Sequence, residues 1–150
     1  MAVGLNSNTV FSINTAAAGA EEESWAVLGK GFKNIAATLN EVIYQATYLG
    51  DDGWASSEVT GGQLTVTLTG DRVYGDAAQD YIFAAERQFG FGDARKTQFK
   101  IENAQYELTG NCTLANITDA GGDANTVDAI TVLIHFNGKP TVTDKSSASV

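Results

Sequence analysis

The two side chains best suited to catalysis are the single histidine and the single cysteine, His135 and Cys112. A nucleophilic site would place the histidine as a base beside a serine or cysteine, with an acid to orient the imidazole ring. The chain has no Gly-x-Ser-x-Gly elbow, and no basic residue adjoins Cys112 to favour its thiolate. We therefore interpret Cys112 as a packed thiol and His135 as part of a strand face, and we predict no enzyme activity.

Acidic and glycine-rich turns are the next candidates, because such turns bind cations or phosphates in other proteins. Asp119 and Asp123 flank two glycines, and Asp51 and Asp52 precede another. Neither pair has the EF-hand spacing or a bidentate glutamate in register. The glycine pairs at 29–31 and 90–92 lack the spacing of a phosphate loop or a dinucleotide fingerprint. These segments are interpreted as solvated turns, so we predict neither a metal nor a cofactor.

The charge balance excludes a surface built to grip nucleic acid. Nine basic and eighteen acidic residues give a net charge of −9, whereas proteins that grip phosphates do so with lysine and arginine. A protein that only encloses DNA is still allowed, because weak repulsion would prevent adhesion. The start of the chain lacks a basic and an apolar signal region, and no run approaches the roughly 18 apolar residues of a membrane span. We expect a cytosolic product without a membrane anchor.

A strand followed by a helix is the clearest local pattern. Between 63 and 69, Leu64, Val66 and Leu68 alternate with polar residues, which predicts one dry and one wet strand face. A helix is predicted over 76–89, with Asp76 as its cap and Gln79 reaching back to complete a capping box. Its apolar stripe recurs at about 3.6-residue spacing and consists of Ala78, Tyr81, Ile82, Ala85 and Phe89.

The remaining patterns predict a mainly β protein of one domain covering residues 1–150. Further strands are expected at 10–14, 25–28, 41–49, 96–103, 106–113 and 126–137, although 36–44 would also suit a helix. Residues 50–58 are polar and glycine-rich, which predicts a long loop. The segments at about 1–24 and 141–150 are expected to be a flexible N-terminal arm and C-terminal tail.

Several long amphipathic strands in one small sheet would leave two unpaired edges. Unpaired edges invite pairing with neighbouring chains. Closing several such sheets into a ring would leave no edge at all.

Several motifs in a fixed order resemble a known protein family. They are Tyr-Leu-Gly-Asp-Asp-Gly-Trp-Ala at 48–55, Val-Thr-Gly-Gly-Gln at 59–63, Gly-Asp-Arg-Val-Tyr-Gly-Asp-Ala-Ala-Gln-Asp-Tyr-Ile at 70–82, Gly-Gly-Asp-Ala at 121–124 and Gly-Lys-Pro at 138–140. Together they cover nearly the whole chain. The sequence is similar to the major tail tube proteins of long, non-contractile tailed phages of Gram-positive bacteria. These motifs are structural rather than catalytic.

The resemblance implies a β-sandwich or barrel-like subunit with one flanking helix. Six copies would form a ring around a continuous inner β-barrel, and stacked rings would form the conduit for genome delivery. The implied partners are copies of the chain itself, a tape-measure protein and DNA held without specific binding in the lumen, and tail initiator or baseplate and tail terminator proteins. The implied location is the virion tail, assembled in the host cytoplasm, with no cofactor.

The resemblance also assigns expected roles to segments. The helix at 76–89 would lie outside the channel, the loop at 50–61 would reach the adjacent ring, and both chain ends would contact other subunits. If wet strand faces line the channel, the lining residues are Glu41, Gln45, Thr47, Gln63, Thr65, Thr67, Thr69, Gln98, Lys100 and Glu102. The candidates for ring stacking are Asp51, Asp52, Trp54, Ser56 and Glu58. Lys100 is the one residue that argues against a purely repulsive wall.

Other functions fit parts of the same pattern. A tube protein of a contractile tail, a tailocin or a type VI-like secretion system would share the architecture. A carbohydrate-binding β-sandwich would use Trp25, Trp54 and the tyrosines as stacking platforms, but such modules are usually exported and no export signal was found. An enzyme is the weakest alternative.

Overall fold

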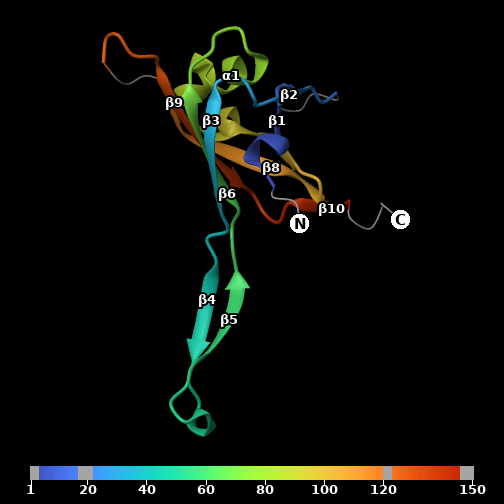
Figure 1. The fold of residues 1–150 in the computed structure, drawn as a ribbon, viewed down its shortest axis with the longest axis vertical. Helices are drawn as coiled ribbons and strands as arrows, with labels where there is room; N and C mark the ends of the chain where they lie inside the picture. Colours follow the sequence, from blue (N-terminus) through green and yellow to red (C-terminus); the bar gives the residue numbers. More distant parts are fainter. Residues whose placement is uncertain (1–3, 17–21, 120–122, 146–150) are drawn as a thin grey trace.

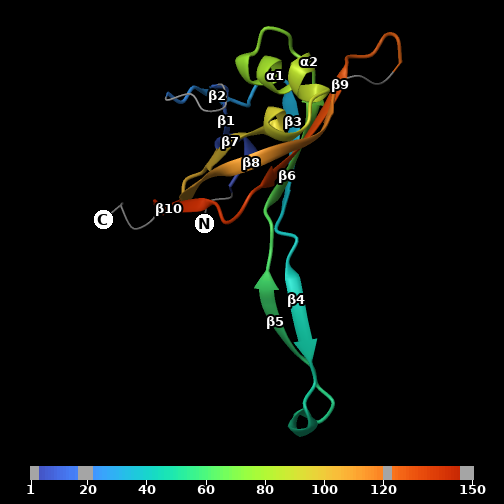
Figure 2. The same ribbon diagram turned by 180° about the vertical axis from the view of Figure 1, so that it is seen from behind.

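The computed structural model describes residues 4–16, 22–119 and 123–145. Within these ranges the chain is mainly β, with a body and one long projecting arm (Figures 1 and 2). The strands are β1 (Val10–Asn14), β2 (Trp25–Val27), β3 (Phe32–Thr38), β4 (Val42–Ala46), β5 (Ser56–Gly61), β6 (Thr65–Asp71), β7 (Lys96–Glu102), β8 (Tyr106–Thr118), β9 (Ala129–Phe136) and β10 (Thr141–Asp144). The α-helices are α1 (Ala77–Ile82) and α2 (Ala85–Gln88), and 3-10 turns cover Asn6–Asn8, Leu49–Asp51 and Gly92–Arg95.

The body is built from one antiparallel sheet that curls upon itself. Its strand order is β2-β1-β7-β8-β9-β6-β3, and β10 pairs with the part of β8 that β9 leaves free. The inner faces of the two halves pack together: the Phe99 ring of β7 lies edge-on to the Phe136 ring of β9, with centroids 6.0 Å apart. Phe11 of β1 shares a hollow with Leu68 of β6 and Ile35 of β3. The predicted mainly β, sandwich-like fold is confirmed.

The core follows the alternation that the sequence shows. Ile130, Val132, Ile134 and Phe136 are all buried on the inner face of β9, as predicted. On β6, Val66 and Leu68 are buried beside them, and Leu64 is half-buried. A buried side chain on every second residue is what a strand with one covered face produces.

The predicted single helix at 76–89 is wrong, because two short helices replace it. Asp76 caps α1 as expected, since its carboxylate accepts a hydrogen bond from the Gln79 amide at 3.2 Å. The helix then stops at Ile82, and Ala84 is extended. The break lets Phe83 turn into the core, where it is 5% exposed, while Phe89 of the predicted apolar stripe lies outside at 76%.

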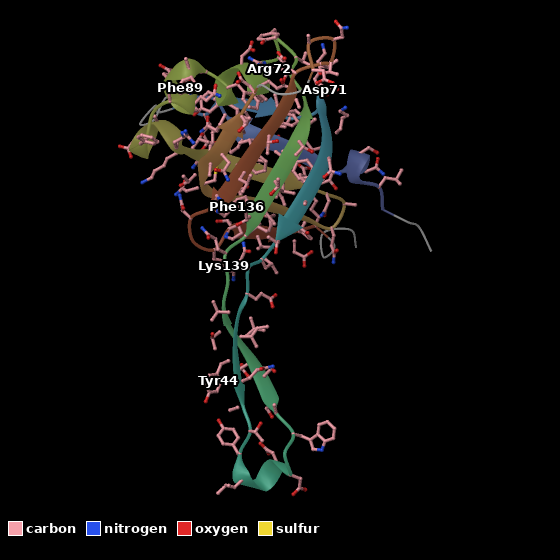
Figure 3. All side chains as sticks on the ribbon, turned by 90° about the vertical axis from the view of Figure 1, so that its left-hand side faces the viewer. Tyr44, Asp71, Arg72, Phe89, Phe136 and Lys139 are labelled. Atoms are coloured by element: carbon pink, nitrogen blue, oxygen red, sulfur yellow. The ribbon has the colours of Figure 1, made fainter. Side chains whose placement is uncertain are left out.

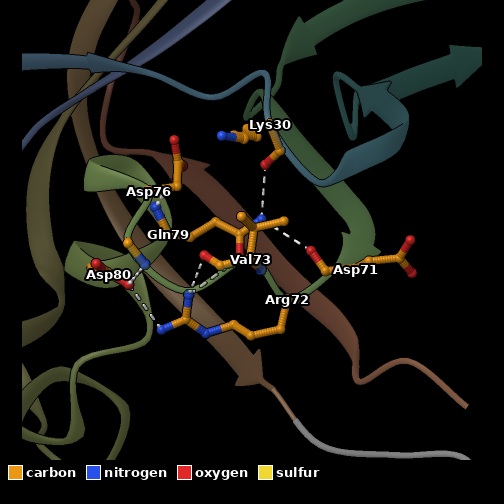
Figure 4. Close-up of polar contacts among 8 residues, drawn as sticks. Lys30, Asp71, Arg72, Val73, Asp76, Gln79 and Asp80 are labelled. Carbon is orange, nitrogen blue, oxygen red and sulfur yellow. Dashed lines mark hydrogen bonds and ion pairs between the residues drawn. The ribbon is translucent and has the colours of Figure 1, made fainter.

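The Gln79 side chain does not complete a capping box; it joins three segments of the body (Figure 4). It is fully buried, donates to the carbonyls of Lys30 at 2.9 Å and Asp71 at 3.0 Å, and accepts from the Val73 amide at 2.7 Å. Gly31 makes room for it: a Cβ there would lie 2.3 Å from the Gln79 amide nitrogen, and its φ is +87°. The network fixes the start of β3 and the end of β6 against α1.

The arm consists of β4 and β5, a two-stranded ribbon that leaves the body between β3 and β6 (Figure 1). The strand predicted at 41–49 is confirmed at Val42–Ala46. The predicted loop at 50–58 is only partly correct, because its last three residues, 56–58, belong to β5. Strand β3 was not predicted; its alanines and its largely exposed position at the sheet border give little alternation.

The two chain ends take more part in the sheet than predicted. Strand β1 pairs with both β2 and β7, and Ile13 is fully buried, so this part of the predicted arm at about 1–24 is structural. Strand β10 pairs with β8, which removes 141–144 from the predicted loose tail. Within the predicted arm and tail, residues 1–3, 17–21 and 146–150 lie outside the described residues.

Candidate assembly surfaces

The outer face of β3, β6 and β9 is a mostly polar surface without net charge. Thr65, Thr67 and Thr69 of β6 stand in its middle row. Their neighbours by register are Thr38, Ala36 and Asn34 on β3 and His135, Leu133 and Thr131 on β9. The charged side chains at the upper end, Lys33 and Asp71, neutralise each other at 3.1 Å. We call this set the neutral face.

The three predicted threonines of the neutral face differ in their surroundings. Thr65 is 6% exposed, accepts a hydrogen bond from the Asn40 amide at 2.9 Å and lies 3.4 Å from His135 Nδ1. Thr67 and Thr69 are half-buried, and their side chains remain available at the surface. Thr65 therefore fixes the base of the arm through Asn40. Thr67 and Thr69 are accessible to another molecule at the surface.

The candidates on β7 lie on the other outer side of the curled sheet. Lys100 pairs with Glu107 at 3.7 Å and lies over the Trp25 ring at 4.4 Å, so its charge is matched within the chain. Glu102 binds Lys145, and this hydrogen bond and the positive charge lower the pKa of the Glu102 carboxyl. Gln98 bonds to Asn14 at 3.1 Å.

The ten predicted lining residues therefore do not form one surface. Thr65, Thr67 and Thr69 share the neutral face, with Gln63 just before it, while Gln98, Lys100 and Glu102 face away on β7. Glu41, Gln45 and Thr47 belong to the arm or its base. The predicted lining set omits six residues of the neutral face, namely Asn34, Ala36 and Thr38 on β3 and Thr131, Leu133 and His135 on β9. Alternation in the sequence places Thr131, Leu133 and His135 on one face of β9. Only the pairing of β9 with β6 shows that this face lies beside the β6 threonines.

The arm carries a run of exposed apolar side chains out to its tip (Figure 3). The tip is an ordered turn, because Asp51 accepts from the Tyr48 amide at 2.9 Å through its carboxylate and from the Trp54 amide at 3.0 Å through its carbonyl. Trp54 is 79% exposed there. The other exposed apolar residues of the arm are Val42, Ile43, Tyr44, Tyr48, Leu49 and Val59.

The predicted stacking residues all lie on this arm. Asp51, Asp52 and Trp54 form the tip, and Ser56 and Glu58 begin β5. An isolated two-stranded ribbon is marginally stable in water, and exposed apolar patches of this extent mark contact sites. The arm is therefore a surface that a partner would cover.

The residues considered for chemistry have structural roles. Cys112 is fully buried, and burial raises the pKa of its thiol to about 12, so it stays protonated at neutral pH. Asp119 accepts a hydrogen bond from the Gln88 amide at 3.1 Å. In the described part of the chain, no three His, Cys, Asp or Glu side chains gather as a group that could hold a metal ion. Nor does any helix of the described residues have the length and apolar character needed to cross a membrane.

Neither a protein-family model nor a curated protein sequence matches the chain. Solved structures do match, over nearly its whole length. A chain from the tail of an empty gene transfer agent particle with C6 symmetry is 15% identical and superimposes with a TM-score of 0.66 over 94% of this chain and 99% of that chain. A chain from the six-fold symmetrised baseplate of the anti-feeding prophage is 8% identical, with a TM-score of 0.63 over 95% and 97%.

A third match comes from a contractile particle. A chain of the PVC sheath-tube complex, from an extracellular contractile injection system in its extended state, is 10% identical and gives a TM-score of 0.53 over 93% of this chain and 90% of that chain. At these identities the likeness defines the fold alone. The chain thus shares its curled antiparallel sheet and its overall architecture with chains of tail particles and of a contractile injection system.

Proposed function

We propose that this chain is the tube subunit of a phage tail or of a phage-derived, tail-like injection particle, with no enzymatic role. The observation that carries the proposal is the match of fold over more than nine-tenths of the chain to chains from six-fold symmetric tail and baseplate assemblies. In this proposal the 150 residues act as one structural domain. Six copies form a ring, and rings stack into a hollow tube.

The sheet borders support ring formation. Strand β3 ends the strand order at one border, beyond β6, and its outer edge has no strand partner among the described residues. A free edge of seven residues is a site for pairing with another chain. Sharing that edge around a closed ring would satisfy its backbone groups and leave no edge exposed.

The neutral face is the surface that we assign to the bore. DNA carries about one phosphate charge per 1.7 Å of axis, so a basic wall would make many simultaneous contacts and resist sliding. Threonine, alanine and asparagine side chains offer no such grip, and the net charge of −9 adds weak repulsion. Charges within about 8 Å of the DNA are still felt at physiological salt. A lining of this kind would let DNA and a tape-measure protein pass without specific binding.

The exposed arm supports stacking between rings. It extends beyond the body along the long axis of the molecule (Figures 1 and 3). Trp54 belongs to the turn at its tip, where its amide donates to the Asp51 carbonyl, and its side chain is exposed. Contact with the neighbouring ring would bury its apolar side chains. The further proposed partners are the tail initiator or baseplate at one end of the tube and the tail terminator at the other, in a virion tail assembled in the host cytoplasm.

The tail class is left open in this proposal. The sequence resembles tube proteins of non-contractile tails, whereas one structural match comes from a contractile injection system. A tube inside a sheath fits the fold at least as well as a tube without one. A sheath gene beside this one would favour the contractile class, and a tape-measure gene without a sheath gene would favour the non-contractile class.

Negative-stain electron microscopy of the concentrated pure protein tests the proposal. We expect hollow tubes of uniform width built from stacked rings. Protein that stays monomeric in sedimentation at every concentration, with and without tail initiator complex, would contradict the proposal.

A further inference from the structure

An open groove lies where the arm joins the body. It encloses a volume of about 1030 Å³ between the end of β3 with the arm base on one side and β8 with β10 on the other. The apolar residues that line the groove are Leu39, Ile43, Leu64, Leu108, Pro140 and Val142. Two of them, Leu64 and Leu108, are half-buried and also pack against the core. Leu39, Ile43 and Val142 are each more than half exposed. The groove is the uncovered end of the core.

A second uncovered apolar feature is the turn between α2 and the Gly92–Arg95 segment, which we call the aromatic turn. Its two rings, Phe89 and Phe91, are 76% and 88% exposed. Arg95 braces the turn from inside, donating to the Gly90 carbonyl at 3.0 Å and to the Gln88 carbonyl at 2.6 Å. Both rings are thus held out on an ordered support, which reduces the entropy lost when a partner covers them.

The two features lie at opposite ends of the body. Figure 3 shows Phe89 beside the helices and Lys139, which lines the groove, at the end from which the arm leaves. In copies stacked along the arm axis, the end of one body that carries the aromatic turn therefore faces the end of the next body that carries the groove. Contacts between two different patches of identical molecules repeat head to tail and build filaments.

The charges at the two ends are complementary. Lys139 lies in the groove lining, and Asp93 follows the aromatic turn by two residues; both are exposed. Neither side chain forms an ion pair with another described residue. Opposite unpaired charges at meeting surfaces favour the correct register between them.

We propose that the aromatic turn of one copy inserts into the arm-base groove of a copy in the adjacent ring, with Asp93 facing Lys139. This contact is separate from that of the arm tip, and it rests on the proposed function because it needs copies stacked along the arm axis. It commits the groove to a second copy of the chain. Both apolar ends of the body become covered in the same step.

Cross-linking of assembled protein tests the geometry. Ala94→Cys and Val142→Cys in one chain place exposed thiols beside the aromatic turn and in the groove without removing either ring. The native Cys112 is buried and protonated, so it should not react with maleimides. A short bis-maleimide should give a ladder of covalent oligomers, because each copy is linked at both ends. The control pair, Ala94→Cys with Val27→Cys on β2, should give no ladder.

Assembly measurements test the energetics of the same contact. Phe89→Ser with Phe91→Ser should raise the critical concentration for tube formation about tenfold or more, since both rings lose their burial. The unfolding midpoint of the monomer should not move, because the rings are exposed there. Asp93→Lys and Lys139→Glu should each impair assembly, and the two together should restore it.

The outcomes separate this inference from the proposed function. Tubes of the cysteine variant without a ladder, or tubes of the serine variant at the wild-type critical concentration, overturn the inference and leave the tube function standing. A charge-reversed double variant that assembles no better than the single variants also overturns it. Failure of the wild-type protein to form tubes in the presence of tail initiator complex contradicts both.

Discussion

Gln79 illustrates how a single buried polar residue organises the upper body. Its amide nitrogen donates to two backbone carbonyls, and its carbonyl oxygen accepts from the Val73 amide and, at 3.3 Å, from the Arg72 guanidinium. The side chain is fully buried yet fully satisfied. Burying a polar group costs little only when its partners are present.

Gln79→Glu should lower the free energy of unfolding by about 3 kcal/mol or more, because a carboxylate oxygen would face two carbonyls and leave both unpaired. Urea unfolding of the monomer measures the change. Gln105→Glu is the matched control, since Gln105 is exposed, and it should stay within about 0.5 kcal/mol of wild type. Equal losses in the two variants would show that the network does not stabilise the fold.

At this scale the sequence predicts local contacts and misses distant ones. Asp76 and the Gln79 amide are three residues apart, so the cap is visible in the sequence. The side chain of Gln79 bonds to Lys30, 49 residues away, and no local pattern marks that pairing. Cys112 and His135 were correctly interpreted as a packed thiol and a residue of a strand face.

Among the elements, the arm has the clearest need for a partner. Within the described residues it meets the body at its base (Figure 1), and Trp54 in the turn at its tip is 79% exposed. Large aromatic residues often contribute most of the energy of an interface. We therefore expect binding of the arm to a partner to depend on a few exposed aromatic rings of the arm rather than on the fold of the body.

Trp54→Ala should leave the unfolding free energy of the monomer within about 0.5 kcal/mol of wild type. It should raise the critical concentration for tubes about tenfold or more and shorten the tubes seen by electron microscopy. Val27→Ala, an exposed apolar change on β2, serves as the control and should assemble normally. Tubes of normal length from Trp54→Ala would contradict the proposed stacking role of this residue.

Strand β10 is held partly by the ion pair between Glu102 and Lys145. Because this pairing lowers the pKa of Glu102 below its ordinary value of 4.5, its contribution is complete above that value and is lost as the pH falls through the lowered pKa. Amide exchange at 141–144, corrected for intrinsic rates, should therefore accelerate only in acid. In Lys145→Met these amides should exchange faster at neutral pH, and their exchange should not accelerate further in acid. An acceleration in acid as large as that of wild type would contradict the role of the ion pair.

Element prediction succeeded where alternation is strong and failed where tertiary contacts decide. Strand β9 was recognised from its buried Ile, Val and Phe residues, although the structure begins it at Ala129. Strand β3 was missed because its alanines fit either a helix or a strand. The helix breaks at Ala84, and the break lets the Phe83 side chain enter the core. A pattern of apolar residues at 3.6-residue spacing does not predict such a break.

At the scale of the whole molecule, the neutral face is the surface that would line the bore of the proposed tube and so decide whether DNA could pass. Its middle row was predicted from the alternation of β6, but its width comes from the pairing of β3 and β9. The residues on β7 had the same alternation and were predicted with it. Because the sheet curls, the β7 residues lie on the side of the body opposite the neutral face. Alternation in the sequence shows which residues share a strand face, but not which side of the folded body that face points to.

Thr67→Lys with Thr69→Lys should leave tube formation intact and slow or stall genome delivery, because paired lysines repeated around the bore would bind phosphates. Thr65 is left unchanged, since it is buried and bonded to Asn40. Thr141→Lys with Thr143→Lys on exposed β10 adds the same charge elsewhere. Infectivity and DNA release should fall only in the first variant; equal infectivity would place Thr67 and Thr69 outside the bore.

Helical reconstruction of the tubes by electron cryomicroscopy tests the central claim most directly. We predict six copies per ring, a closed inner wall in which β3 pairs with the adjacent copy, and Thr67 and Thr69 facing the axis. A reconstruction in which the neutral face lies on the exterior or is buried between subunits, or in which the copies enclose no bore, would contradict the claim.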